Sequence, residues 1–159
     1  MTEPRRGAPG TPTGSTGDAR NGARMLLFEV GGRIYACGID AVREIIPFRR
    51  CTRLPGAPSF VCGLINLRGT LVTVLDLAAR LDAGTVDRTE GSIVLAEHGS
   101  KVVGIGVDRV RDVQPIPPDE IEPATGDDAR GGIVRGLAHL DEQVVVLLDV
   151  PQLVRQALL

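Results

Sequence analysis

Aromatic residues are scarce in this chain of 159 residues: three Phe, one Tyr and no Trp make up 3% of the sequence. Proteins that bind single-stranded nucleic acid stack bases on aromatic side chains, so the shortage counts against that class. The charge points the same way, because 18 Lys and Arg against 20 Asp and Glu give a net charge of −2 and no basic excess. A small-barrel nucleic-acid-binding protein is therefore kept only as a remote alternative.

Cysteine and long apolar segments are also in short supply. The three cysteines, Cys37, Cys51 and Cys62, are odd in number and form no CxxC motif, which disfavours a disulfide framework. The sequence shows no signal-peptide pattern, and no apolar run approaches the roughly 18 residues that a membrane-spanning helix needs. We therefore expect a cytoplasmic protein without direct insertion into a membrane.

Aliphatic residues supply what the aromatics do not. The chain has 18 Val, 17 Leu and 10 Ile, and because Val and Ile favour strands, this composition favours an all-β fold. Its 20 Gly and 11 Pro suit a chain with many turns. The length fits one domain, or two small halves that share one core.

Residues 1–24 differ from the rest of the chain. They contain no Val, Ile, Leu, Phe or Tyr, so they cannot bury enough apolar surface to offset the entropy of ordering, and we expect a disordered tail. From Met25 onward, apolar runs separated by turn residues predict strands at 26–30, 33–37, 63–67, 71–75, 92–96, 101–107, 133–140 and 144–148. Residues 40–46 fit either a short helix or a strand, residues 114–132 look like a connector, and 151–159 form the terminal helix.

The folded part contains an internal duplication. Residues 63–77 align with 136–150 with six of fifteen positions identical, and 38–45 align with 106–113 with four of eight identical. The two segments recur in the same order, so we infer two similar β subdomains of about five strands each. Each half is near the size limit for an independent core, so the halves are expected to fold as one unit.

No known catalytic motif is present. The sequence lacks GxSxG, HExxH and P-loop patterns, and neither of its two histidines has other ligands at metal-binding spacing. Cys51 lies beside Arg50 and Arg53, which could lower its thiol pKa and make it reactive. We expect a protein that is not an enzyme and binds neither metal nor cofactor.

Two charged positions stand out when the halves are compared. Arg68-Gly69 occupies a hairpin turn where the other half has Asp141-Glu142. Period-2 alternation places Leu64, Asn66 and Arg68 on one strand face, and Val42, Glu44 and Ile46 on another. Glu44 and Arg68 are therefore either contact residues or simple solvated surface charges.

Several segments closely resemble the CheW-like domain, the adaptor of bacterial chemosensory arrays. The resemblance covers about 25–159, and its most specific part is the string Ala57-Pro58-Ser59-Phe60-Val61-Cys62-Gly63-Leu64-Ile65-Asn66-Leu67-Arg68-Gly69. It implies two intertwined five-stranded SH3-like β-barrel subdomains with a C-terminal helix. One departure is Gly38, where the family often has Pro.

The family resemblance also implies a function. Such adaptors are non-catalytic and bind the regulatory domain of a CheA-type histidine kinase, the cytoplasmic tip of a methyl-accepting chemoreceptor and, in array rings, other CheW-like domains. By this resemblance Val42, Glu44, Asn66 and Arg68 are partner-binding residues, while Gly63 and Gly69 serve the backbone shape. Kinase contacts are expected at apolar strand ends. The pathway output stays open between flagellar chemotaxis and an alternative such as pili or development.

Overall fold

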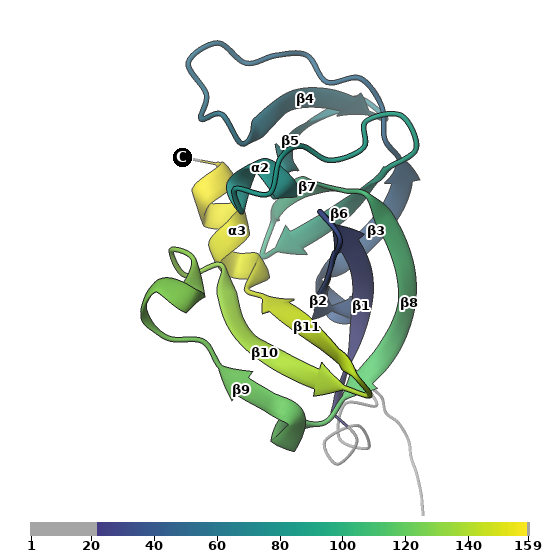
Figure 1. Cartoon of the computed structure of the whole chain (residues 1–159). Helices are drawn as coiled ribbons and strands as arrows, with labels where there is room; N and C mark the ends of the chain where they lie inside the picture. Colours follow the sequence, from purple (N-terminus) through teal and green to yellow (C-terminus); the bar gives the residue numbers. More distant parts are fainter. Residues whose placement is uncertain (1–21, 159) are drawn as a thin grey trace, which may run out of the picture.

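The protein is built from two β-sheets. The computed structural model describes residues 22–158, and Figure 1 shows the sheets stacked one above the other with a helix between them. The first sheet has the strand order β8 (Arg109–Ile116), β1 (Ala23–Val30), β2 (Arg33–Gly38), β11 (Gln143–Leu148), β10 (Val134–Leu140) and β9 (Ile121–Pro123). The second has the order β3 (Val42–Pro47), β6 (Ser92–His98), β7 (Lys101–Val107), β5 (Thr70–Asp76) and β4 (Val61–Leu67).

The expected fold class is confirmed: the chain is mainly β, with two sheets and a C-terminal helix. The first sheet has six strands rather than five because the short β9 adds to its edge beside β10. The helices are α2 (Leu77–Arg80) and α3 (Val150–Ala157), with single 3-10 turns at Ile39–Ala41, Pro118–Glu120 and Gly126–Ala129. No helix within residues 22–158 combines the length and apolar character that crossing a membrane requires.

The strand pairing repeats with the two offsets seen in the sequence. In the second sheet, β4 and β5 pair Gly63 with Val74, and in the first, β10 and β11 pair Gly136 with Leu147, 73 residues later. Likewise the pairing of Phe28 with Val110 has its counterpart 68 residues away, where Val42 pairs with Ala96. The two sheets are therefore built on the same pattern of registers.

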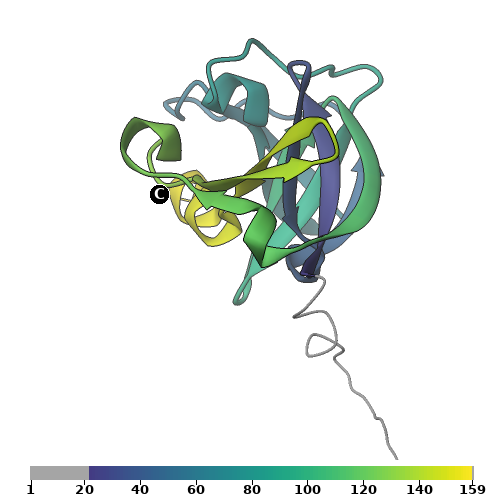
Figure 2. The same ribbon diagram turned by 60° about the horizontal axis from the view of Figure 1, so that its bottom comes forward.

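The sheets do not coincide with the sequence halves. Strands β1 and β2, from the first half, pair with β8 and β11 of the second, while β6 and β7 pair with β3 and β5 of the first. Figure 2 shows the same exchange, with β8 running beside β1 along the edge of the curved first sheet. Each sheet thus contains strands of both halves, so neither half can complete its own sheet.

One large aliphatic core joins the two sheets. It contains Phe28 and Leu148 of the first sheet, Val94 and Ile105 of the second, and the buried face of α3. Each sheet also has one smaller apolar cluster of its own. Although α3 follows a strand of the first sheet, it packs against β6 and β7 of the second, which fixes the sheets relative to each other.

Three expectations need adjustment. Strand β1 begins at Ala23, two residues before the expected boundary, while residues 1–21 of the expected tail lie outside the described residues. The ambiguous segment 40–46 contains the end of a 3-10 turn followed by β3. The connector expected at 114–132 is partly wrong, because it holds the end of β8 and all of β9. Pro115 is tolerated in β8 because that strand lies at a sheet edge.

Candidate functional site

The turn between β4 and β5 carries the first pair of expected site residues. Arg68 and Gly69 both have positive φ, 52° and 87°, as the two central residues of a tight hairpin turn with right-handed strand twist require. Glycine adopts this conformation without strain, whereas an arginine there is uncommon. The turn thus projects Arg68 away from its strand, with 68% of its side chain exposed.

Arg68 forms an ion pair with Glu44. Its Nη2 atom donates a hydrogen bond to Oε2 of the Glu44 carboxylate, which lies on β3 at the opposite edge of the second sheet. The hydrogen bond from Arg68 lowers the pKa of Glu44, and the same bond raises the pKa of Arg68. The two residues border a shallow cavity of about 200 Å³, whose apolar floor includes Leu95 and Val102.

Asn66 shapes this turn from the inside. Its side-chain Oδ1 accepts a hydrogen bond of 2.9 Å from the backbone N–H of Gly69, and its backbone carbonyl accepts one of 3.1 Å from Nη2 of Arg49. An asparagine side chain that bonds the backbone a few residues ahead is a common turn-stabilising device. Asn66 therefore holds the conformation that presents Arg68, and Arg49 is a contact that the sequence did not reveal.

Val42 lies on the other face of β3 from Glu44, so the expectation that Val42, Glu44 and Ile46 share a face is wrong for Val42. A β-bulge between Val42 and Glu44 shifts the register, so that Val42 pairs with Ala96 but Glu44 pairs with Leu95. Adjacent residues of β6 point to opposite faces. Val42 consequently packs half-buried against the shared core, whereas Ile46 packs in the interior of the second sheet.

Gly63 allows a close backbone contact. It sits at a second bulge with φ of 145°, and a Cβ atom there would lie 2.2 Å from the carbonyl oxygen of Thr52. Thr52 and Leu64 exchange two backbone hydrogen bonds of 2.8 Å, which fasten the loop before β4 to that strand. By contrast, the space around a Cβ at Gly69 is open, so only its backbone conformation favours glycine.

Comparing the halves shows that the Glu44–Arg68 pair has no counterpart. The positions equivalent to Glu44 and Arg68 are Asp112 and Asp141, two residues of like charge. Another ion pair does recur, since Arg43–Glu97 and Arg111–Glu29 occupy equivalent positions with N–O distances of 4.0 and 3.7 Å. The ion pair between Glu44 and Arg68 is therefore a feature of the second sheet that the first sheet does not share.

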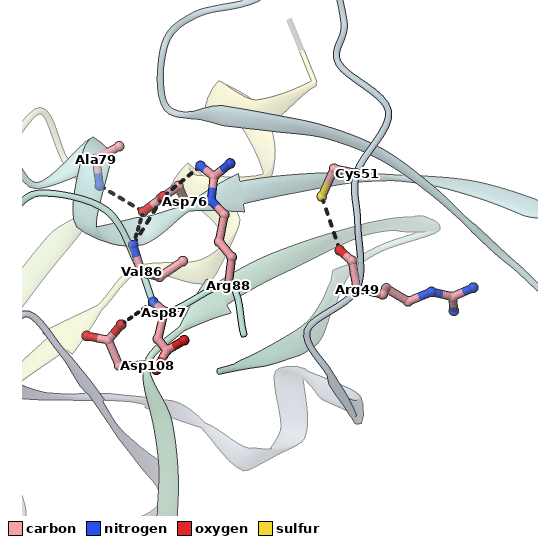
Figure 3. Close-up of polar contacts among 8 residues, drawn as sticks. All are labelled: Arg49, Cys51, Asp76, Ala79, Val86, Asp87, Arg88 and Asp108. Carbon is pink, nitrogen blue, oxygen red and sulfur yellow. Dashed lines mark hydrogen bonds and ion pairs between the residues drawn. The ribbon is translucent and has the colours of Figure 1, made fainter. Parts of the chain in front are cut away.

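The buried carboxylate of Asp76 holds the loop that follows α2. Asp76 is fully buried and accepts hydrogen bonds from the backbone N–H groups of Ala79 and Val86, at 3.0 and 3.2 Å, and from Nη2 of Arg88 at 3.0 Å (Figure 3). Asp108 accepts 2.7 Å bonds from the N–H groups of Asp87 and Gly31, and so ties this loop to the first sheet. Nothing in the sequence indicated that Arg88 would be the partner of Asp76.

The expectation that Cys51 has a lowered pKa is wrong. Partial burial, together with a hydrogen bond to Cys62, raises the pKa of Cys51 to about 12. The guanidinium of Arg49 points away from Cys51, whose thiol faces the carbonyl oxygen of Arg49 at 3.8 Å (Figure 3). Within residues 22–158 no group of three or more His, Cys, Asp and Glu side chains is placed to hold a metal ion.

Comparisons with known proteins agree on one family. Residues 24–158 match the family model described as the CheW-like domain. The chain is 34% identical over 133 residues to "Chemotaxis protein CheW" of Rhizobium meliloti, covering 81% of this chain and 86% of that one. It is 36% identical over 110 residues to the Bacillus subtilis protein of the same name, covering 69% and 70%.

A solved structure and a differently named relative complete the comparison. The crystal structure of scaffolding protein TtCheW from Thermoanaerobacter tengcongensis superposes with a TM-score of 0.73 at 27% identity, covering 81% of this chain and 85% of that one. "Protein PilI" of Pseudomonas aeruginosa is 32% identical over 93 residues, which is 58% of this chain and 52% of that protein.

Proposed function

We infer that this chain, which belongs to the CheW-like domain family, acts as a non-catalytic adaptor in bacterial chemosensory signal transduction. The family model matches nearly all of the described residues. Proteins named as chemotaxis and scaffolding proteins are similar to the chain in sequence and, for the solved structure, in fold. In this role the protein couples a chemoreceptor to a CheA-type histidine kinase, working in the cytoplasm at the inner face of the membrane.

The receptor-binding surface is assigned on the basis of the Glu44–Arg68 pair. Its arginine is mostly exposed, its carboxylate is held ionised, and the pair stands beside a small apolar-floored cavity. Glu44 leaves several guanidinium N–H groups of Arg68 available to a partner, while Asn66 fixes the turn. We propose that Glu44, Asn66 and Arg68 bind the receptor tip, with Val42 contributing from the junction of the two sheets.

Exposed apolar residues at strand starts are candidates for contacts with the kinase or with other CheW-like domains. Leu71 at the start of β5 and Val144 at the start of β11 occupy equivalent positions, and their exposed fractions are 65% and 51%. Large aliphatic side chains in such positions gain free energy when a partner covers them. We propose that each sheet offers one such contact.

The mechanism follows from the rigid connection between the two sheets. The shared core and α3 hold the surfaces of both sheets in one geometry. A shift in the receptor tip that changes its contacts with the adaptor would then alter the relative stability of the active and inactive kinase states. The adaptor contributes geometry and differential contacts, and no bond is made or broken.

A pair of charge variants tests the receptor assignment. Arg68→Asp is expected to abolish receptor binding, and the reversed double variant Glu44→Arg with Arg68→Glu is expected to keep an ion pair but still fail to bind. Kinase binding should persist in both, and Arg155→Asp on α3 is the control for an equal change of charge. Receptor binding by Arg68→Asp at the level of the control, measured by titration against a receptor cytoplasmic fragment, would contradict the assignment.

The kinase assignment has its own test. Leu71→Ser and Val144→Ser should each weaken binding to the kinase regulatory domain or to a second CheW-like domain, while receptor binding is retained. Unchanged affinity for every CheW-like partner in both variants would remove these residues from the interface.

The output of the pathway is a separate question, because the same adaptor chemistry serves flagellar chemotaxis or another output such as pili or development. The partner genes discriminate between these outputs: a receptor and kinase encoded beside this gene would identify the pathway.

A further inference from the structure

A cavity of about 430 Å³ lies on the second sheet, between the loop that precedes β4 and the loop that follows α2. We call it the arginine cavity, because its walls include Arg49, Arg50, Arg53 and Arg88. Its volume falls in the range of about 300–1,000 Å³ that is usual for small-molecule sites. It is separate from the smaller cavity beside Glu44 and Arg68, and the function proposed above does not use it.

The arginine cavity carries uncompensated positive charge. Arg88 is paired with the buried carboxylate of Asp76, as Figure 3 shows. Among residues 22–158, no carboxylate forms an ion pair with Arg49, Arg50 or Arg53, and none of the lining residues is acidic. The site therefore has the charge to attract an anion.

The Cys51 thiol in the wall does not change this balance. Cys51 and Cys62 both line the cavity. Because burial raises the pKa of Cys51 to about 12, its thiol is neutral near pH 7 and adds no negative charge to offset the arginines.

Backbone contacts hold the walls in place. Thr52 and Leu64 exchange two hydrogen bonds of 2.8 Å, and the N–H of Phe48 donates to the carbonyl of Gly91 at 3.0 Å, which joins the two loops. Arg88 is oriented from behind by Asp76 at 3.0 Å. The backbone of both walls and the Arg88 guanidinium are thus held in place before a ligand arrives, which lowers the entropic cost of binding.

The remaining lining is apolar, which narrows the class of ligand. Phe48, Leu54, Pro58 and Val61 contribute to the walls, so a ligand with only charged groups would leave this surface unused. A phosphate monoester carries nearly two negative charges near pH 7 and offers three acceptor oxygens, which suits several guanidinium groups better than a single carboxylate does.

We propose that the arginine cavity binds a small molecule that carries a phosphate group beside a compact apolar part. Such a ligand would give the adaptor a chemical input at a site distinct from the receptor surface, joined to it by the hydrogen bond from Arg49 to the Asn66 carbonyl.

The test is a titration of the full-length, ¹⁵N-labelled protein with phenyl phosphate, a phosphate monoester with a compact apolar ring. Saturable shifts are expected at the backbone amides of residues 48–62 and of Arg88. Arg50→Gln and Arg53→Gln should each raise the dissociation constant about tenfold, as expected for the loss of a charge-assisted hydrogen bond. The control Arg155→Gln, which removes the same charge from α3, should leave it unchanged within about twofold. Equal unfolding midpoints of the three variants show that each is folded.

Three results would overturn the proposal. One is the absence of saturable shifts with phenyl phosphate up to about 10 mM, a concentration that detects even weak binding. Another is an equal rise of the dissociation constant in Arg155→Gln, because binding would then depend on the overall charge of the protein and not on the cavity. The third is saturable binding of a glutamate-rich peptide without any binding of phenyl phosphate, which would make the cavity a docking surface for protein.

Discussion

Asp76 and Asp149 occupy equivalent positions in the two halves, and each accepts a 3.0 Å hydrogen bond from a backbone N–H in the first turn of the helix that follows. They differ in their surroundings. Within residues 22–158 the side chain of Asp149 accepts only this capping bond, whereas the carboxylate of the fully buried Asp76 also accepts bonds from Val86 and Arg88.

This difference predicts unequal effects of the same substitution. Asp149→Ala should lower the free energy of unfolding by about 1 kcal/mol, the usual cost of losing a helix cap. Asp76→Ala should cost about 3 kcal/mol, because it also leaves the Val86 N–H and the Arg88 guanidinium without their partner. Urea unfolding of the two variants measures both values, and equal losses would contradict a special role for Asp76.

The ion pair predicts the titration of Glu44. Since the hydrogen bond from Arg68 lowers the pKa of Glu44 in the folded state, its carboxyl carbon should titrate below the ordinary value of about 4.3. The stabilisation from this pair is present above the pKa of Glu44 in the unfolded chain and is lost as the pH falls through the lowered folded-state pKa.

Carbon-detected NMR of the Glu44 side chain checks this prediction. Arg68→Gln should return the pKa toward the ordinary value, whereas Arg155→Gln should not move it. A Glu44 carboxyl that titrates alike in all three proteins would show that the pair does not persist in solution.

The two site glycines should respond differently to alanine. Gly63→Ala places a Cβ 2.2 Å from the Thr52 carbonyl oxygen, so the backbone contact must break and the loss should reach about 3 kcal/mol. Gly69→Ala meets no neighbour and should cost only about 1 kcal/mol for its left-handed conformation.

Hydrogen exchange separates the two effects. The Leu64 amide, which donates to Thr52, should lose protection in Gly63→Ala but keep it in Gly69→Ala. Retained protection in Gly63→Ala would mean that the loop tolerates the added methyl group.

The raised pKa of Cys51 predicts slow alkylation. Thiolate is the reactive form, so a pKa of about 12 should make the reaction with iodoacetamide at pH 8 at least about a hundredfold slower than that of an ordinary cysteine. Mass spectrometry of the Cys62→Ser variant follows Cys51, since Cys37 is fully buried. Removing Cys62 also removes one cause of the shift, so the rate in the unsubstituted chain should be slower still. Modification at the rate of a free thiol would contradict this environment.

The local structure and the family could be predicted from the amino-acid sequence. The strands at 26–30 and 33–37 and the C-terminal helix were predicted correctly because they depend on residues close together in the chain. The internal repeat likewise pointed to paired elements, and the string ending at Arg68-Gly69 identified the family that the comparisons confirm. Among the site residues, Arg68 was marked by its contrast with the acidic turn in the other half.

How these pieces meet depends on contacts between residues that lie far apart in the chain. The exchange of β1 and β2 between halves depends on pairing with strands far along the chain, which no local pattern encodes. The bulge that turns Val42 away from Glu44 breaks the strict alternation on which the prediction relied. The partnership of Asp76 with Arg88, the raised pKa of Cys51 and the arginine cavity arise from burial and from loops brought together by the fold. These properties depend on three-dimensional surroundings, so the spacing of residues along the chain does not predict them.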